Sequence, residues 1–173
     1  MKCYLDTSAL LKPAFGEDEA DDYKTTLQML KASGWTMVTS VLSQVEVRRA
    51  IRREVASGRI PGESADEKIA LLFDGIDIID IDQQVIDEAC VIDGEGLRSL
   101  DAIHLATARL IGADMVIAYD ERLLRACMDR GVMTAQPGAL RPYLPDGWEF
   151  IPDTEDIDWD AIDRLEEQTL GLP

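Results

Sequence analysis

The chain has 173 residues, the length of one ordinary domain, and its 46% of hydrophobic residues is too high for a disordered protein. Its formal net charge of -17 is unusual for a nucleic-acid-binding protein, because such proteins commonly present a basic surface to phosphates. No apolar run approaches the roughly 20 residues that span a bilayer, and Asp6 interrupts the apolar N-terminus, so we expect no membrane anchor, no signal peptide and a cytosolic location.

Short apolar strands and helices alternate along most of the chain. The pattern predicts strands at residues 2–6, 36–40, 76–81, 115–119 and 132–135. It predicts helices at residues 17–33, 41–57, 63–73, 83–92, 99–111 and 121–130, and a short helical turn after residue 8 that Pro13 kinks. The helix at 41–57 has Val45, Val47, Ile51 and Val55 as its apolar positions. This alternation predicts an α/β fold with a doubly wound, mostly parallel central sheet flanked by helices.

The charge is distributed unevenly. Residues 146–173 contain ten acidic residues and one basic residue, whereas residues 44–60 contain five arginines and two glutamates. We therefore predict a domain over residues 1–140 and an acidic C-terminal extension over residues 141–173. Apolar residues at helical spacing indicate one amphipathic helix near 158–170 in that extension.

The three cysteines, Cys3, Cys90 and Cys127, are far apart, and each lies in an apolar context. We predict that all three are small buried side chains in a reducing compartment. A thiolate metal site would require closely spaced pairs, which this sequence does not contain.

Four acidic residues occupy positions that a parallel sheet brings toward one edge. Asp6 and Asp120 directly follow apolar strands, whereas Glu46 and Asp101 lie in early helical turns. Converging carboxylates raise each other's pKa values unless a cation offsets their charge, and carboxylate oxygens suit Mg²⁺ or Mn²⁺. The spacing alone leaves open the alternative that these are chance neighbours among 34 acids, some of them ordinary helix-terminal residues.

Three segments around these acids resemble the PIN-domain family, specifically toxins of the VapC type. They are YLDTSALLK, TSVLSQVEVRRAI and LRSLDAIHLATARLIGADMVIAYDERLLRACMDRGV. The resemblance covers residues 1 to about 137 and puts the family's four catalytic acids on Asp6, Glu46, Asp101 and Asp120. It implies that Asp6, Asp101 and Asp120 hold divalent metal, that Glu46 contacts it directly or through water, and that RNA is hydrolysed with its help. It also implies a homodimer and a small antitoxin partner.

Two pairs of residues beside the acids are candidates for positioning substrate. Thr7 and Ser8 have hydroxyls that suit a phosphate oxygen or the adjacent carboxylate, with helix capping as the alternative role. Arg49 and Arg53 lie three and seven residues after Glu46, on nearly the same helical face, and suit an RNA backbone. The alternative for this pair is a solvated helix face that offsets nearby acids.

Two further positions bear on the expected site. His104, the only histidine, is predicted to pack beside the site and not to act as a ligand. Ala118 departs from the family pattern, which often has Thr two residues before the last acid.

Other functions fit parts of the sequence. Two alternatives remain, a stand-alone PIN nuclease that is not a toxin and a non-catalytic acidic interaction protein that mimics nucleic acid.

Two other classes of protein are excluded by missing residues. A receiver-like signalling domain needs a lysine after a late strand, but all five lysines lie within the first 68 residues. A phosphatase with an aspartyl nucleophile needs a second Asp two residues after the first, where this chain has Ser8.

Overall fold

The computed structural model describes residues 1–94 and 96–139. In this part of the chain, strands lie in the order β3-β2-β1-β4-β5, and all neighbouring pairs are parallel. The strands are β1 (Lys2–Leu5), β2 (Thr36–Ser40), β3 (Asp77–Ile79), β4 (Met115–Ile117) and β5 (Met133–Ala135). The register places Tyr4 of the central strand opposite Val38 on one side and Val116 on the other. The predicted parallel α/β sheet is confirmed.

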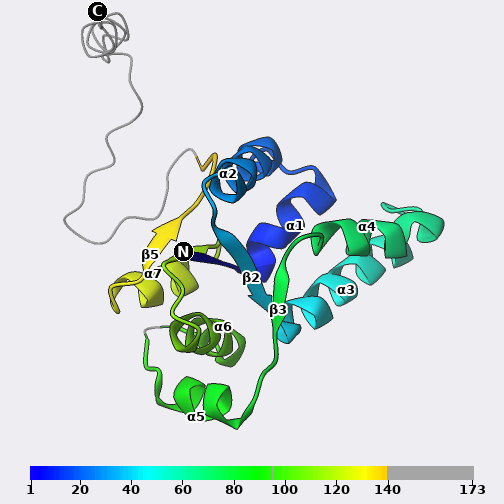
Figure 1. Cartoon of the computed structure of the whole chain (residues 1–173). Helices are drawn as coiled ribbons and strands as arrows, with labels where there is room; N and C mark the ends of the chain where they lie inside the picture. Colours follow the sequence, from blue (N-terminus) through cyan, green and yellow to red (C-terminus); the bar gives the residue numbers. More distant parts are fainter. Residues whose placement is uncertain (95, 140–173) are drawn as a thin grey trace, which may run out of the picture.

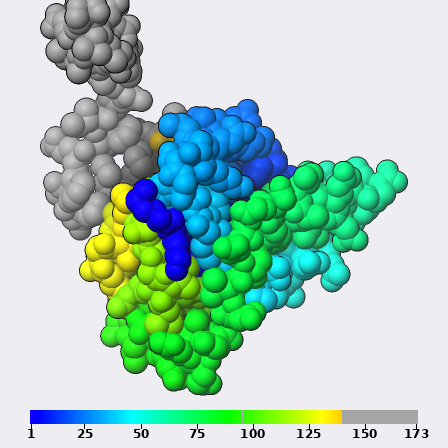
Figure 2. Space-filling model, viewed as in Figure 1, coloured from blue at the N-terminus to red at the C-terminus, as the bar shows by residue number. Residues whose placement is uncertain are grey.

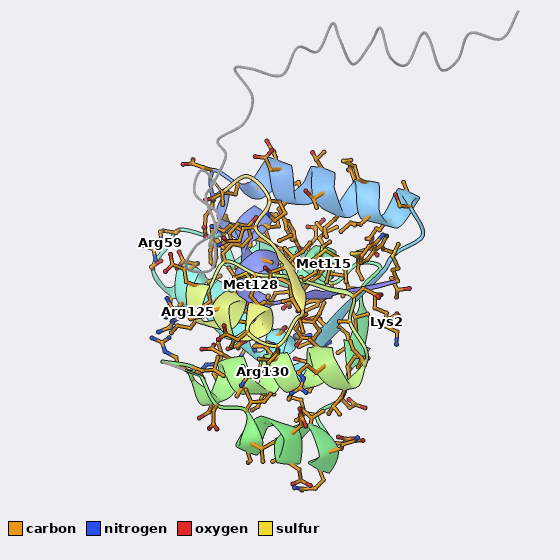
Figure 3. All side chains as sticks on the ribbon, turned by 90° about the vertical axis from the view of Figure 1, so that its left-hand side faces the viewer. Lys2, Arg59, Met115, Arg125, Met128 and Arg130 are labelled. Carbon is orange, nitrogen blue, oxygen red and sulfur yellow. The ribbon has the colours of Figure 1, made fainter. Side chains whose placement is uncertain are left out.

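Helices cover both faces of the sheet (Figure 1). They are α1 (Thr7–Phe15), α2 (Ala20–Ala32), α3 (Val41–Ala56), α4 (Ala65–Leu72), α5 (Gln83–Val91), α6 (Ser99–Leu110) and α7 (Glu121–Met128), with a 3-10 turn at Gly62–Ser64. The first four helices pack on one face and the last three on the other, so that the core has two halves. The connection between α3 and α4 projects at the right of the space-filling view (Figure 2).

The central strand shows why both faces are apolar. Side chains alternate between the two faces of a strand. Cys3 and Leu5 therefore pack against the α1–α4 half of the core, while Tyr4 packs against the α5–α7 half. All three are fully buried. A parallel strand buried on both sides has no polar face, and this explains the continuous apolar run before Asp6.

Several predicted boundaries differ from the observed ones. The helix that contains Pro13 continues to Phe15 and ends at Gly16, which has a φ of 63°. Pro13 lies in the last turn, where it removes one helical hydrogen bond, while Leu10 and Ala14 keep this part of the helix packed in the core. The predicted strands at 76–81 and 115–119 are shorter, at Asp77–Ile79 and Met115–Ile117.

Two residues from apolar stretches of the sequence face solvent. Cys90 on α5 is exposed, so the prediction of three buried thiols is wrong for this one. Val45 on α3 is 52% exposed, although Val47 and Ile51, two other apolar positions of the same helix, are buried. The cause is the same for both, since helical spacing identifies an apolar side chain but not whether a neighbouring element covers it.

The predicted acidic extension, with its amphipathic helix, lies outside the described residues. Within the described ranges, no helix is both long and apolar enough to cross a bilayer.

The different burial of the three thiols predicts their reactivity. Burial raises the pKa values of Cys3 and Cys127 to about 12, so both remain protonated near pH 8. Iodoacetamide should therefore alkylate one thiol per chain in the native protein, at Cys90, and three after unfolding. Mass spectrometry of a digest measures the sites. The Cys90→Ser protein should take up none while folded, and rapid alkylation of Cys127 in the native state would contradict the described core.

Candidate active site at the carboxyl edge of the sheet

Two of the predicted acids lie where adjacent strands end. The strands β1 and β4 pair side by side, with Leu5 opposite Ile117, and the Asp6 backbone N–H continues the pairing by donating to the Ile117 carbonyl at 3.0 Å. Asp6 caps α1, and Asp120 caps α7. Asp6 is only 6% exposed, whereas Asp120 is partly exposed. The carboxyl edge of the sheet therefore begins with a buried acid.

Ser8 fixes the Asp6 carboxylate and connects it to the β4 side. Its hydroxyl donates to Asp6 Oδ2 at 2.5 Å, and its backbone N–H donates to the same oxygen at 2.9 Å. The same hydroxyl accepts a hydrogen bond from the Tyr119 backbone N–H at 2.8 Å. One serine thus joins the start of α1 to the loop that leads to Asp120.

Glu46 is held by a histidine and a threonine. His104 Nε2 lies 3.0 Å from Glu46 Oε2 and 3.5 Å from Asp6 Oδ1, and Thr7 donates its hydroxyl to Glu46 Oε2. Since an ionised carboxylate can only accept, His104 Nε2 carries a proton. Tyr4 O–H lies 2.8 Å from His104 Nδ1 and orients the ring from the core side. The histidine therefore connects the acid of α3 with the acid that follows β1.

The pKa values of this pair show how closely they interact. Burial acts to lower the pKa of His104, but the hydrogen bond that its Nε2 donates to Glu46 and the charges of Asp6 and Glu46 outweigh it, so the pKa is raised overall. Burial acts to raise the pKa of Glu46, but the hydrogen bonds from His104 and Thr7 hold it below its ordinary value. Glu46 therefore stays ionised at neutral pH.

Asp101 interacts electrostatically with two of the other acids. Burial raises its pKa above the ordinary value, and the negative charges of Asp120 and Asp6 raise it further. Its Oδ2 accepts a hydrogen bond from the Arg98 backbone N–H at 3.1 Å, in the capping box of α6. Asp101 is therefore near enough to Asp120 and Asp6 to be affected by their charges.

Asp120 is paired with an arginine that the sequence reasoning missed. Arg122 Nη2 lies 2.7 Å from Asp120 Oδ2, and Arg122 Nε lies 3.2 Å from Asp120 Oδ1. This two-point ion pair is the first cause that holds the pKa of Asp120 below its usual range. An arginine two residues after a helix-capping acid was the available signal, since that spacing lets its side chain fold back onto the cap.

The carboxylates do not form a closed metal cage in this geometry. Within residues 1–94 and 96–139, no three His, Cys, Asp or Glu side chains are grouped so as to hold a metal ion. Asp120 is turned toward Arg122, and Asp101 is turned toward the backbone at Arg98. The donors nevertheless fit a hard cation, because they are all carboxylate oxygens, and after burial the charges of Asp120 and Asp6 contribute to the raised pKa of Asp101.

A groove lies beside Glu46, between α1, α3 and the start of α6. It has a volume of about 490 Å³ and is lined by Thr7, Leu11, Leu42, Val45, Glu46, Arg49, Ala50, Arg53 and Leu100. The two arginines predicted to position substrate therefore share one surface with an acid of the site. Arg48 and Arg52 are exposed on the same helix but do not line the groove.

Ala118 has no polar side chain to offer the site. It is fully buried, and its backbone N–H bonds to the Ala135 carbonyl at 3.3 Å. The methyl group packs in the α5–α7 half of the core.

These features define an α/β domain with an acidic site at the carboxyl edge of a parallel sheet. Residues 3–128 match the model of the PIN domain family, so this chain belongs to that family.

Named relatives agree with this assignment. Ribonuclease VapC47 of Mycobacterium tuberculosis is 41% identical over 140 residues, which cover 80% of this chain and 98% of that protein. Ribonuclease VapC46 of the same species is 34% identical over 136 residues, covering 78% of this chain and 96% of that protein. The crystal structure of VapBC2 from Rickettsia felis bound to a promoter DNA fragment shares the fold, with a TM-score of 0.61 at 16% identity over 78% of this chain and 98% of that one.

The double role of Ser8 predicts a stability effect. Ser8→Ala leaves the Tyr119 backbone N–H without its partner and removes the hydroxyl donor to the Asp6 carboxylate, which keeps the backbone N–H of residue 8 and His104, so the free energy of unfolding should fall by about 1–3 kcal/mol. Urea denaturation measures this loss. Ser99→Ala is the control, because Ser99 is exposed and also lies at a helix start. Equal stability of the two variants would show that the Ser8 bridge contributes nothing.

Proposed function

We propose that this protein is a divalent-metal-dependent endoribonuclease that hydrolyses RNA phosphodiester bonds and is the toxin of a toxin–antitoxin pair. The observation that carries the proposal is the placement of Asp6 and Asp120 after the neighbouring strands β1 and β4, at the carboxyl edge of the sheet, with the charges of both acids acting on Asp101. The reaction class is supported by 41% identity to a named ribonuclease over nearly its whole length.

Three carboxylates would hold Mg²⁺ or Mn²⁺, namely Asp6, Asp101 and Asp120, with Glu46 contacting the ion directly or through water. A bound divalent ion supplies a water of lowered pKa and neutralises charge on the scissile phosphate. The protein's own groups prepare this site before any ion arrives. Ser8 orients the Asp6 carboxylate, and its other hydrogen bond prevents the serine from rotating away.

Glu46 has a separate task in this proposal. His104 and Thr7 keep it ionised and fix its direction, so that it can accept a proton from, or orient, an attacking water. His104 acts from behind the carboxylate, where it is 2% exposed, and does not contact the substrate. Thr7 and Ser8 thus act on acids in this structure, which favours positioning of the acids over direct phosphate contact.

The groove beside Glu46 suits an RNA backbone. Arg49 and Arg53 line it at successive turns of α3 and would bind phosphates, which places the following phosphate near the acids. The strongly negative total charge does not oppose this, because α3 carries four arginines within six residues, at 48, 49, 52 and 53.

The proposed partners are a small antitoxin and a second copy of this chain in a homodimer. The antitoxin is supported by the likeness in fold to VapBC2 from Rickettsia felis and to a toxin–antitoxin complex from Klebsiella pneumoniae. A stand-alone nuclease is the alternative. A short neighbouring gene for a DNA-binding protein would favour the toxin, and its absence would favour the alternative. We propose a cytosolic location, where RNA is available.

The ligand role of Asp6 predicts a loss of both metal and activity. Asp6→Asn should abolish RNA cleavage and reduce Mn²⁺ affinity by at least about 10–100-fold, the loss typical of disturbing even the groups around a metal ligand. The fold should survive, because the amide oxygen can still cap α1. Titration calorimetry with Mn²⁺ and a gel assay of RNA cleavage measure the two effects.

Asp129→Asn is the matched control, since Asp129 is exposed at the far end of the helix that Asp120 caps. It should bind Mn²⁺ and cleave RNA as the unmodified protein does. Failure of the unmodified protein to bind Mn²⁺, or full cleavage by a folded Asp6→Asn protein, would refute the metal site.

The groove arginines predict a change in salt dependence. In the Asp6→Asn background, which prevents cleavage, Arg49→Ala with Arg53→Ala should weaken single-stranded RNA binding. The slope of log affinity against log salt should become smaller by about 1.4, or about 0.7 for each lost phosphate contact. The matched control is Arg48→Ala with Arg52→Ala, which changes charge equally outside the groove. An equal decrease in both proteins would mean that α3 attracts RNA through its overall charge and not through the groove.

A further inference from the structure

The groove beside Glu46 is more apolar than a phosphate-binding surface requires. Leu11 of α1 and Leu42 of α3 contribute partly buried side chains, while Val45 is 52% exposed and Leu100 is 45% exposed. Four aliphatic side chains from three helices therefore share one solvent-facing depression. Apolar surface gathered in this way usually marks a site that binds an apolar segment of protein.

Basic charge adjoins this apolar surface on the same helix. Arg49 lies one turn after Val45 and Arg53 one further turn along, so the apolar and basic parts of the groove follow each other along α3. Neither guanidinium forms an ion pair with a carboxylate within the described part of the chain. The surface as a whole suits a segment with aliphatic or aromatic residues next to acids.

We propose that residues 153–170 of this same chain bind in the groove. This segment contains eight acidic residues and one arginine, and its sequence places acids directly beside apolar residues. Trp159, Ile162 and Leu165 follow each other at intervals of three, and Asp163 and Glu166 come directly after two of them. A helical conformation would put these residues on one side, because residues three apart share a face. The segment thus complements both the aliphatic wall and the arginines.

The length of the chain permits this contact. The described chain ends at residue 139, and the 13 residues 140–152 lie between this point and residue 153. Fully extended, they span up to about 45 Å, which exceeds the roughly 40 Å diameter of a domain of this size. A linker of this length holds the acidic segment near the groove at an effective concentration of about 1 mM. A free partner of equal affinity would have to be present at a similar concentration to occupy the groove to the same extent.

The extra length also distinguishes this chain from its relatives. The alignment with Ribonuclease VapC47 covers 98% of that protein but only 80% of this one, and the family match ends at residue 128. The acidic segment is therefore additional to what the family domain requires. Binding in the groove of its own domain would give this acidic segment a function, although the segment lies outside the part of the chain that aligns with the relative.

Binding in the groove has a consequence for RNA. Arg49 and Arg53 cannot hold acids of the segment and phosphates at the same time, so RNA must displace the segment. This competition rests on the proposed ribonuclease function, whereas the contact itself does not.

The contact can be tested in the full chain with 5-fluorotryptophan. Its three tryptophans give three fluorine resonances, which Trp35→Phe, Trp148→Phe and Trp159→Phe proteins assign. The Trp159 resonance should show the small solvent isotope shift of a buried ring. Arg49→Glu with Arg53→Glu should move this resonance to its solvent-exposed position, whereas the control, Arg48→Glu with Arg52→Glu, should leave it unchanged.

A charge exchange makes the test specific. Adding Asp163→Lys and Glu166→Lys to the Arg49→Glu, Arg53→Glu protein should restore the buried Trp159 signal. A solvent-exposed Trp159 in the unmodified protein, or a buried one that ignores the groove charges, would overturn the proposal. A signal that becomes buried only as protein concentration rises would overturn binding within one chain in favour of a second copy.

The dependence on RNA separates the two proposals. Adding a short single-stranded RNA in the presence of a chelator should shift the Trp159 resonance toward its exposed position. If Trp159 is buried by the groove but RNA leaves it unchanged, the contact stands and the competition with RNA fails.

Discussion

The site depends on one buried negative charge. Asp6 follows the central strand directly, so the packing of both halves of the core forces its carboxylate out of water. An ionised carboxylate in such a place is costly unless it is hydrogen-bonded or paired. The protein supplies two donors from Ser8 and a protonated ring nitrogen from His104. Each of these partners also forms a second hydrogen bond, Ser8 with the Tyr119 backbone and His104 with the Glu46 carboxylate. The groups that stabilise the buried charge of Asp6 therefore also position much of the carboxyl edge of the sheet.

The core explains why His104 can serve in this way. Tyr4 is fully buried and points from β1 into the α5–α7 half, where its hydroxyl meets the other ring nitrogen. The ring is thus held between a core tyrosine and an acid on α3. The charge of the site and the packing of the sheet are parts of one hydrogen-bonded chain that runs from Tyr4 through His104 to Glu46 and Thr7.

Much of the fold could be predicted from the sequence, because apolar strands and amphipathic helices alternate and glycines mark helix ends. Strand lengths at 76–81 and 115–119 could not, since β propensity continues beyond the residues that find a partner strand. The four acids were predicted with their element positions, but not the directions of Asp101 and Asp120. The two side-chain directions depend on hydrogen bonds to Arg98 and Arg122. These residues are close in sequence, but the pattern of residue types does not reveal which contacts they make. The exposure of Val45 depends on the spacing of α1, α3 and α6, which helical periodicity does not encode.

The ion pair between Arg122 and Asp120 makes two binding events depend on each other under the proposed function. A metal ion must displace the guanidinium from Asp120, and a displaced guanidinium is a strong, planar phosphate binder beside the acids. Any phosphate that takes up Arg122 therefore removes the competitor for metal, and by thermodynamic linkage metal must strengthen phosphate binding by the same factor. The domain would hold its metal weakly when alone and more tightly with a nucleic acid in place. Readiness to react would then be a property of the complex and not of the free protein.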